Sequence, residues 1–221
     1  MSNGIKNSDG SQKSRRVLML LIGIFFMGTG IALIIKSRTG TSPMSSLTNV
    51  MTQVYPVLTL GMYTFLLNVL FFIGEFIVDR KSFSASKFLQ LIPTFFLSVA
   101  VDLNMFLFRN VQPDIYVAKL LILLTGCIFF GLSIAFMVSA DVILMPGEAL
   151  IKIISVKYMK EYGNVKTAVD VSLVVLAVIV SLLCLKTIYG VREGTLIAAF
   201  TIGNFSRLFR GCTNKLVREV A

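Results

Sequence analysis

The stretch Gly126–Leu150, GCIFFGLSIAFMVSADVILMPGEAL, repeats a pattern that the chain has already used once. The earlier stretch, Gly23–Leu47, reads GIFFMGTGIALIIKSRTGTSPMSSL, and the two align without a gap. Apolar composition alone would supply a few matches, but it does not explain two glycines and a proline held in register. The matched pairs are Gly23 with Gly126, Phe26 with Phe129, Gly28 with Gly131, Ile31 with Ile134, Ala32 with Ala135, Pro43 with Pro146 and Leu47 with Leu150.

A gap of one residue extends this alignment toward the C-terminus. We therefore interpret the chain as two copies of one unit of about a hundred residues. The further matched pairs are Gly61 with Gly163, Asn68 with Asp170, and Asp102 with Asn204.

Composition places the chain in a membrane. It has 221 residues, 56% of them hydrophobic, and a mean hydropathy of +0.84. Uncharged runs such as 17–35 and 120–140 are long enough to cross about 30 Å of hydrocarbon at about 1.5 Å per residue. The first run is too long for the apolar region of a signal peptide, and no small-residue cleavage site follows it. We interpret it as an uncleaved first span.

Several functional classes are disfavoured by the composition. The net charge of +10 is scattered between apolar runs, so nucleic acid is not an expected partner. Histidine is absent, and no phosphate-binding GxxxxGK[ST] loop occurs. We expect no enzymatic activity, cofactor or metal. Cys127 and Cys184 lie in apolar runs and are expected to act as small buried hydrophobes; Cys212 completes an odd set.

The apolar runs predict an all-α polytopic membrane protein with six transmembrane helices. Each copy contributes three spans, with a short amphipathic helix after the first. Because three is odd, the second copy enters the bilayer inverted, an arrangement typical of secondary transporters. A duplication that only builds a stable bundle is the alternative. The expected spans are 16–37, 58–79, 87–108, 117–139, 165–187 and 193–210, the last having the shortest uncharged run.

The tails and the loop charges predict the orientation. Of the 21 Lys and Arg residues, fifteen fall on the side that holds the N-terminus and six on the other. Both termini are therefore expected in the cytoplasm. We divide the chain into a disordered polar tail (1–16), a first repeat (17–110), a second repeat (111–210) and a basic tail (211–221).

Each short helix has a clear start. Ser42 suits an N-cap and Pro43 the first helical position, and the second copy begins at Pro146. Unpaired amides at such a start favour an anion or a polar oxygen. If the helices re-enter the membrane, they line the entrance to a site; lying flat on the surface is commoner, and we expect it. The candidate entrance residues are Thr41, Ser42, Pro43, Ser45, Pro146, Gly147 and Glu148.

Acids and amides at membrane depth are the candidate binding residues, because a central charge costs about 2.5–3.5 kcal/mol there. Asp102 and Asp170 lie inside spans three and five, and their repeat partners are Asn204 and Asn68. Each matched position thus holds one acid and one amide. We expect the four side chains to converge in the bundle interior on a cation, a proton or a polar solute.

Local pairing offers another explanation for some acids. Lys166 precedes Asp170 by one helical turn, so an ion pair accounts for this acid equally well. Asp102 has no basic neighbour at that distance, and we expect it to be the functional acid. Glu75 is expected to pair with Arg80 at the membrane interface.

Small residues predict close helix contacts. Gly28 and Ala32 form a small-xxx-small face on the first span, which favours packing within the chain over contact with a second copy. The candidate packing residues are Gly23, Gly28, Ala32, Gly126, Gly131 and Ala135.

These features resemble the YczE/YyaS/YitT family of bacterial integral membrane proteins. The resemblance rests on GIFFMGTGIALIIKSRTGTSP, on the short helix after it, on the echo GLSIAFMVSADVILMPGEAL and on the spacing to GTLIAAFTIGNFSRLF. It covers most of residues 17–210 and implies a polytopic plasma-membrane protein without an agreed substrate. It supplies no catalytic residues.

Three functions remain open from the sequence. The first is a transporter or permease for a small polar solute or cation, with its site at the repeat interface and a homodimer as a possible form. The second is a substrate-binding membrane subunit that docks on a separate ATPase through Gly28 and Ala32. The third is an accessory protein that transports nothing. The lipid bilayer is an expected partner in each.

Overall fold

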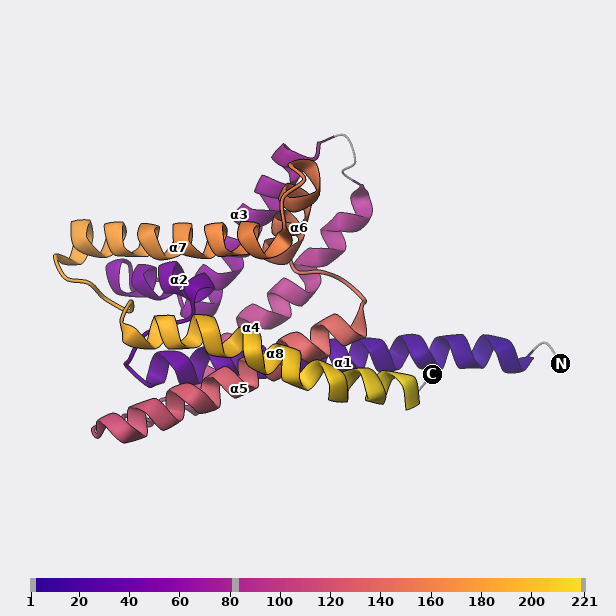
Figure 1. Cartoon of the computed structure of the whole chain (residues 1–221), viewed down its shortest axis with the longest axis horizontal. Coiled ribbons are helices and arrows are strands. Elements are labelled where there is room, and N and C mark those ends of the chain that lie inside the picture. The colour runs from indigo at the N-terminus through magenta and orange to yellow at the C-terminus, as the bar shows by residue number, and fades with distance from the viewer. Residues whose placement is uncertain (1–2, 81–83, 220–221) are drawn as a thin grey trace.

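The computed structural model describes residues 3–80 and 84–219, with side chains for 14–80, 84–211 and Thr213. The elements of the described residues are helices, and their order of long, short, long and long occurs twice (Figure 1). The first half holds α1 (Asn3–Lys36), α2 (Pro43–Val54), α3 (Leu60–Val78), the 3-10 helix η1 (Ala85–Gln90) and α4 (Leu91–Leu107); the second holds α5 (Tyr116–Ala140), α6 (Pro146–Lys157), α7 (Tyr162–Leu185) and α8 (Glu193–Glu219).

Local chemistry explains the helix ends. Pro43 and Pro146 stand at the first positions of α2 and α6, where a missing N–H costs nothing. The Thr59 side chain caps α3 by accepting a hydrogen bond from the Met62 amide. α5 ends at Asp141, whose φ of 46° lies in the left-handed region that stops a helix.

The helices form two groups (Figure 1). One group contains α1, α4, α5 and α8, and the other contains α2, α3, α6 and α7. Each short helix packs on a long helix of the opposite half, so that α2 lies on α7 and α6 lies on α3. The two groups meet mainly where α3 packs along α4.

Glycines bring α1 and α5 into close contact at the centre of the first group. A Cβ atom on Gly30 would lie 2.8 Å from the backbone nitrogen of Phe130, and one on Gly126 would lie 2.9 Å from that of Ile34. Residue numbers rise along α1 as they fall along α5, so the two helices are antiparallel. Only glycine permits backbones to approach this closely.

Another glycine in each half, Gly28 in α1 and Gly131 in α5, faces the third long helix of that half. A Cβ atom on Gly28 would lie 2.8 Å from the carbonyl carbon of Ala100 in α4, and one on Gly131 would lie 2.5 Å from the Cβ of Phe205 in α8. Ala32 and Ala135 are fully buried, and Gly23 lies against α5. The face of Gly28 and Ala32 is therefore covered within the chain, and this particular face is not available for an ATPase to dock on.

The short helix α2 is buried among other helices, so it does not have the solvent-exposed polar face that we expected of an amphipathic helix. Ser46 and Val50 are fully buried, and Thr48 is nearly so. The hydroxyls of Ser46 and Thr48 donate to the carbonyls of Pro43 and Ser45 one turn back. A hydroxyl satisfied by its own helix can be buried, so these polar residues do not mark a solvent-facing side.

Five described helices are long and apolar enough to cross a membrane: α1, α3, α4 with η1, α5 and α7. α8 is not among them, because its sequence carries Arg207 and Arg210. α1 begins at Asn3 and thus continues through the expected disordered tail, since a stable span can propagate a helix into a flank without proline. Five basic residues of the orientation count have side chains outside the described set: Lys6, Lys13, Lys81, Lys215 and Arg218.

The close contact of α1 with α5 predicts that Gly30→Ala destabilises the protein. The added methyl group would overlap backbone atoms of Phe130 and Gly126, and overpacking of this kind costs about 1–3 kcal/mol. We expect a lower melting temperature in detergent. Gly211→Ala is the control, because nothing lies within 4 Å of its Cβ position and alanine favours a helix. Equal melting of the two variants would contradict the packing described here.

Candidate functional site

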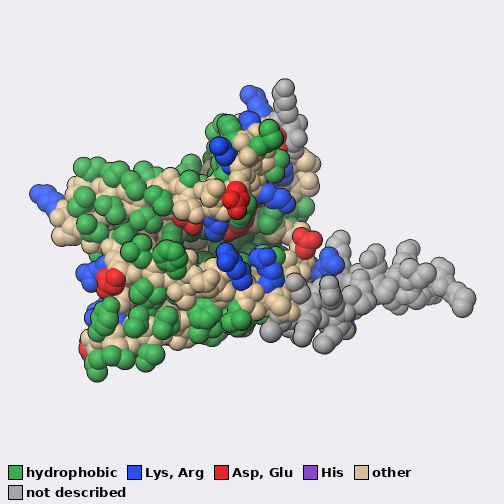
Figure 2. All heavy atoms as spheres, in the orientation of Figure 1, with side chains coloured by type: hydrophobic (Ala, Val, Ile, Leu, Met, Phe, Trp, Pro, Cys, Tyr) green, Lys and Arg blue, Asp and Glu red, His purple; other side chains and the backbone are tan. Residues whose placement is uncertain are grey.

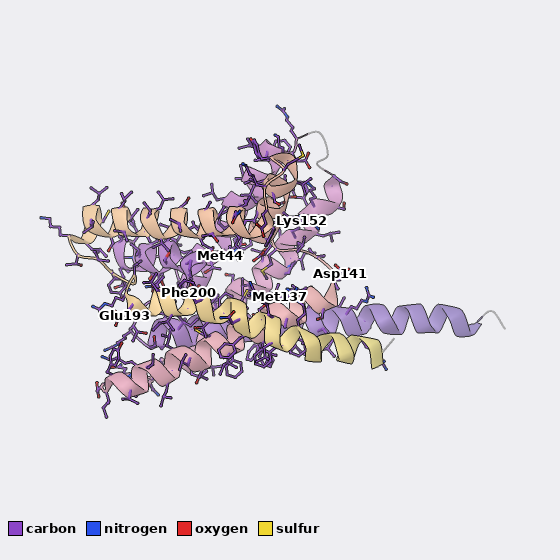
Figure 3. The ribbon with its side chains drawn as sticks, viewed as in Figure 1. Met44, Met137, Asp141, Lys152, Glu193 and Phe200 are labelled. Atoms are coloured by element: carbon purple, nitrogen blue, oxygen red, sulfur yellow. The ribbon has the colours of Figure 1, made fainter. Side chains whose placement is uncertain are left out.

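A cavity of about 500 Å³ lies between the two helix groups and has walls from both halves of the chain. The first turns of α2 and α6 both border it, through Ser42 and Ser45 in one and Gly147 in the other. Met44, Met137 and Lys152 belong to three of its walls (Figure 3). Figure 2 shows basic and acidic side chains along the hollow between the upper and lower helices. The cavity is therefore polar at some walls, although it lies among apolar helices.

A charged cluster occupies the wall made by α6 and α7. The Lys166 Nζ lies 3.2 Å from the Glu148 Oε1 and 4.0 Å from the Asp170 Oδ2. The Tyr162 hydroxyl donates a hydrogen bond to the other oxygen of Glu148. The Asp170 Oδ1 is buried and has no hydrogen-bond partner among the described residues. One lysine thus serves two carboxylates, and one carboxylate oxygen is left for another donor.

The facing wall, made by α8, is basic. Arg207 and Arg210 line it together with Ser206 and Gly203. Neither arginine forms an ion pair with a described acid. With Lys152 and Lys166 added, the lining carries four basic and two acidic side chains.

The repeat gives the charged cluster a neutral counterpart. At the positions that match Glu148, Lys166 and Asp170, the first copy has Ser45, Thr64 and Asn68. These three side chains also line the cavity. The cavity therefore has one charged and one neutral polar side, contributed by the same helices of the two copies.

The four predicted binding residues do not converge. Asn68 and Asp170 line the cavity, whereas Asp102 borders a second hollow of about 580 Å³ and Asn204 is exposed on α8. The Asp102 carboxylate accepts hydrogen bonds from the Gly61 amide at 2.8 Å and from the Thr59 hydroxyl at 2.6 Å. It thus caps the start of α3 from a neighbouring helix, a role that explains the acid without a ligand.

The predicted entrance residues are divided between two places. Ser42, Pro43, Ser45, Gly147 and Glu148 line the cavity. Pro146 is buried behind them, and Thr41 bonds elsewhere: its amide donates to the Thr195 hydroxyl at 3.1 Å and its hydroxyl to the Gly190 carbonyl at 3.0 Å.

Glu75 is paired, but with a different residue from the one expected. Its side chain is 1% exposed and lies 2.9 Å from the Lys87 ammonium, while the Arg80 guanidinium lies over the Phe76 ring. Lys87 belongs to η1, which returns the chain to α3 after the loop. A pairing between elements of this kind cannot be read from helical spacing.

Sequence reasoning missed the contact of Glu148 with Tyr162 and Lys166. The signal was present, because Lys166 stands in a long apolar run and matches Thr64 of the first copy. Among the described residues there is no group of three His, Cys, Asp or Glu side chains that could hold a metal ion.

A family model described as "Family of unknown function (DUF6198)" matches residues 14–211. The chain belongs to this family. It is also 31% identical over 115 residues to the uncharacterized protein YyaS of Bacillus subtilis (strain 168), a match that covers 52% of this chain and 55% of that protein. The matched part thus spans about half the length of that relative. No solved structure matches the chain. The resemblance to a YyaS-like bacterial family is confirmed.

The position of Asp102 predicts a stability effect. Asp102→Ala removes the acceptor for the Gly61 amide and the Thr59 hydroxyl, and we expect a loss of about 1–2 kcal/mol, measured by thermal or denaturant unfolding. Asp114→Ala, which removes an exposed acid, is the matched control. An unchanged stability of the Asp102 variant, together with loss of ligand binding, would return Asp102 to the candidate site.

Proposed function

We propose that this chain is a transporter for a small polar solute in the bacterial plasma membrane, with the cavity between the helix groups as its binding site. The observation that carries the proposal is the cluster of Glu148, Lys166 and Asp170 inside the cavity. Ionisable groups among membrane spans are costly and usually mark a substrate or ion pathway. A volume of about 500 Å³ is in the usual range of small-molecule sites.

The packing of α8 supports a sixth span. Gly131 of α5 faces Phe205 of α8, and the Ser139 hydroxyl donates to that of Thr213 at 2.8 Å farther along both helices. Residue numbers rise along α5 and α8 in the same direction, from Gly131 and Phe205 to Ser139 and Thr213, so α8 runs parallel to α5 and beside it. If α5 crosses the membrane, α8 crosses with it. Arg207 and Arg210 line the cavity, where water can solvate them, which makes their presence in a span tolerable.

The exchanged positions of α2 and α6 support an inverted repeat. α1 packs on α4 as α5 packs on α8, and each short helix crosses to the opposite half. Such an arrangement gives a protein two related ways of opening, one toward each side of the membrane. The two termini lie at the same end of the molecule (Figure 1), and the excess of basic residues supports a cytoplasmic position for that end.

The lining favours a solute that carries an anionic group. Basic side chains outnumber acidic ones, and the starts of α2 and α6 add partial positive charge. A carboxylate on the solute would find donors on the α8 wall and at the helix starts. The neutral side offers hydroxyl and amide groups to the polar remainder of the solute through Ser45, Thr64 and Asn68.

Ligand-dependent stability tests this proposal. The purified protein is heated with a panel of small carboxylates, amino acids and inorganic cations. A ligand at a hundredfold excess over its Kd stabilises the folded state by about 2.7 kcal/mol. We expect a solute from the carboxylate class to raise the melting temperature of the wild type, and Lys166→Met to abolish the shift. Lys160→Met removes an exposed lysine nearby and should leave the shift intact.

Uptake of the same solute into proteoliposomes then separates a carrier from a binding subunit. Saturable uptake by the wild type that Lys166→Met loses supports transport. Binding without uptake favours the subunit that docks on a separate ATPase. If no solute stabilises the wild type and Lys166→Met melts like it, the accessory-protein hypothesis replaces transport.

A further inference from the structure

We infer that the N-terminal part of α7 closes onto α8 and shuts the cavity at the end of the molecule that holds both termini. The purpose of this movement rests on the proposed transport function. The movement itself follows from a comparison of the two halves of the chain, one of which is already closed.

In the first half, α3 is closed against α4 and η1. A Cβ atom on Gly61 would overlap the carbonyl oxygen of Ser98, so the two backbones touch there. The Gly61 amide also donates to Asp102 at 2.8 Å. Farther along the pair, Phe65 packs edge-on against Phe95 with ring centroids 6.4 Å apart. The face of α3 that contains Gly61 and Phe65 is thus covered.

In the second half, the corresponding face of α7 is open. Gly163 matches Gly61, and nothing lies within 4 Å of its Cβ position. Thr167 matches Phe65 and is exposed. α7 packs mainly on α2 and α6, and its contact with α8 is at most slight. In the most apolar window of each helix, 17% of the residues are buried in α7 and 33% in α3.

The facing surface of α8 suits a close approach. Gly203 lines the cavity, and nothing lies within 4 Å of its Cβ position either. A glycine on each helix lets two backbones meet, as Gly61 does in the first half. The charges also complement one another, because Arg207 of α8 faces a cavity that Glu148 and Asp170 line from the other side. Closure would bring these opposite charges together and supply a donor for the unpartnered oxygen of Asp170.

The other end of α7 is held in place. The Gly194 amide donates to the Thr39 carbonyl at 2.9 Å, and the Thr41 hydroxyl donates to the Gly190 carbonyl at 3.0 Å. These bonds tie the α7–α8 connection to the α1–α2 connection. α7 therefore has a fixed end near Gly190. Its other end, near Gly163, is joined to α6 through the bonds of Tyr162 and Lys166 to Glu148, so closing is a pivot about the fixed end that carries the start of α6 along.

Oxidative cross-linking tests the closure. Gly163→Cys with Gly203→Cys is made in the full chain after Cys127→Ala, Cys184→Ser and Cys212→Ser. A disulfide requires Cα atoms within about 7 Å, so the bond forms only when α7 approaches α8. We expect an intramolecular cross-link in detergent without added solute. Leu196→Cys with Gly163→Cys is the control: Leu196 is 67% exposed and precedes Gly203 by about 10 Å of helix, and roughly tenfold less cross-link is expected.

Three results would overturn the inference. They are the absence of a cross-link in the Gly203 pair, equal cross-linking in the control pair, and a cross-link only between two chains, which would assign the open face to a second copy. If the Gly203 pair does not elute as folded protein, Thr167→Cys with Gly203→Cys tests the same approach one turn along α7. Spin labels at Gly163 and Gly203 give an independent measurement, for which we expect a second, shorter distance population.

The outcomes for closure and for transport are distinguishable. A cross-link in a protein that no solute stabilises supports the movement and removes the transport proposal. Solute uptake by a protein whose helices never cross-link supports transport and removes the movement.

Discussion

The contact of α1 with α5 is the constraint on which the rest of the structure depends. Gly30 and Gly126 let the two backbones approach until only glycine fits between them. Gly28 and Gly131, which match each other in the two copies, attach α4 to α1 and α8 to α5 in the same manner. These four contacts fix one group of helices from both copies at once. The second group is then placed by the crossing of the short helices to the opposite half, and the cavity is the space that remains between the groups.

The two copies share a framework but differ in charge. Where the first copy has Ser45, Thr64 and Asn68, the second has Glu148, Lys166 and Asp170. Hydroxyl and amide groups can satisfy themselves within a helix, as Thr64 and Asn68 do by donating to carbonyls one turn back. Charged groups cannot, and they must find each other, water or a ligand. The charged side of the cavity is therefore the one whose polar groups are left incompletely paired.

The repeat made much of this fold predictable. Glycines and prolines in register indicated the long helices, the short helices and several close contacts between them, because those residue types are required wherever backbones meet or a helix starts. Gly30, which meets Phe130, has no matched glycine in the second copy and was not predicted as a packing residue. The prediction of a polar, exposed face for α2 was wrong, for a reason that the periodicity of the sequence does not reveal. Ser46 and Thr48 count as polar in a sequence, yet their hydroxyls bond within the helix and are buried. The prediction that Asp102 shares a site with Asp170 was also wrong. Matched sequence positions predict matched helices, but they do not predict which turn of a helix meets which neighbour.

The α3–α4 pair is closed and the α7–α8 pair is open because different residues stand at matched positions of the two copies. In the first half, a hydrogen bond from the Gly61 amide to the Asp102 side chain holds the pair together. Farther along the two helices, the rings of Phe65 and Phe95 pack between them. In the second half, an amide, Asn204, replaces the acid, and Thr167 replaces the ring of Phe65. An amide still offers an oxygen to a backbone N–H, but without the negative charge that strengthens the bond about twofold. The same positions of α7 and α8 thus offer weaker contacts for closing the second pair. A pair of helices whose closure is only weakly favoured is one that a bound solute can shift.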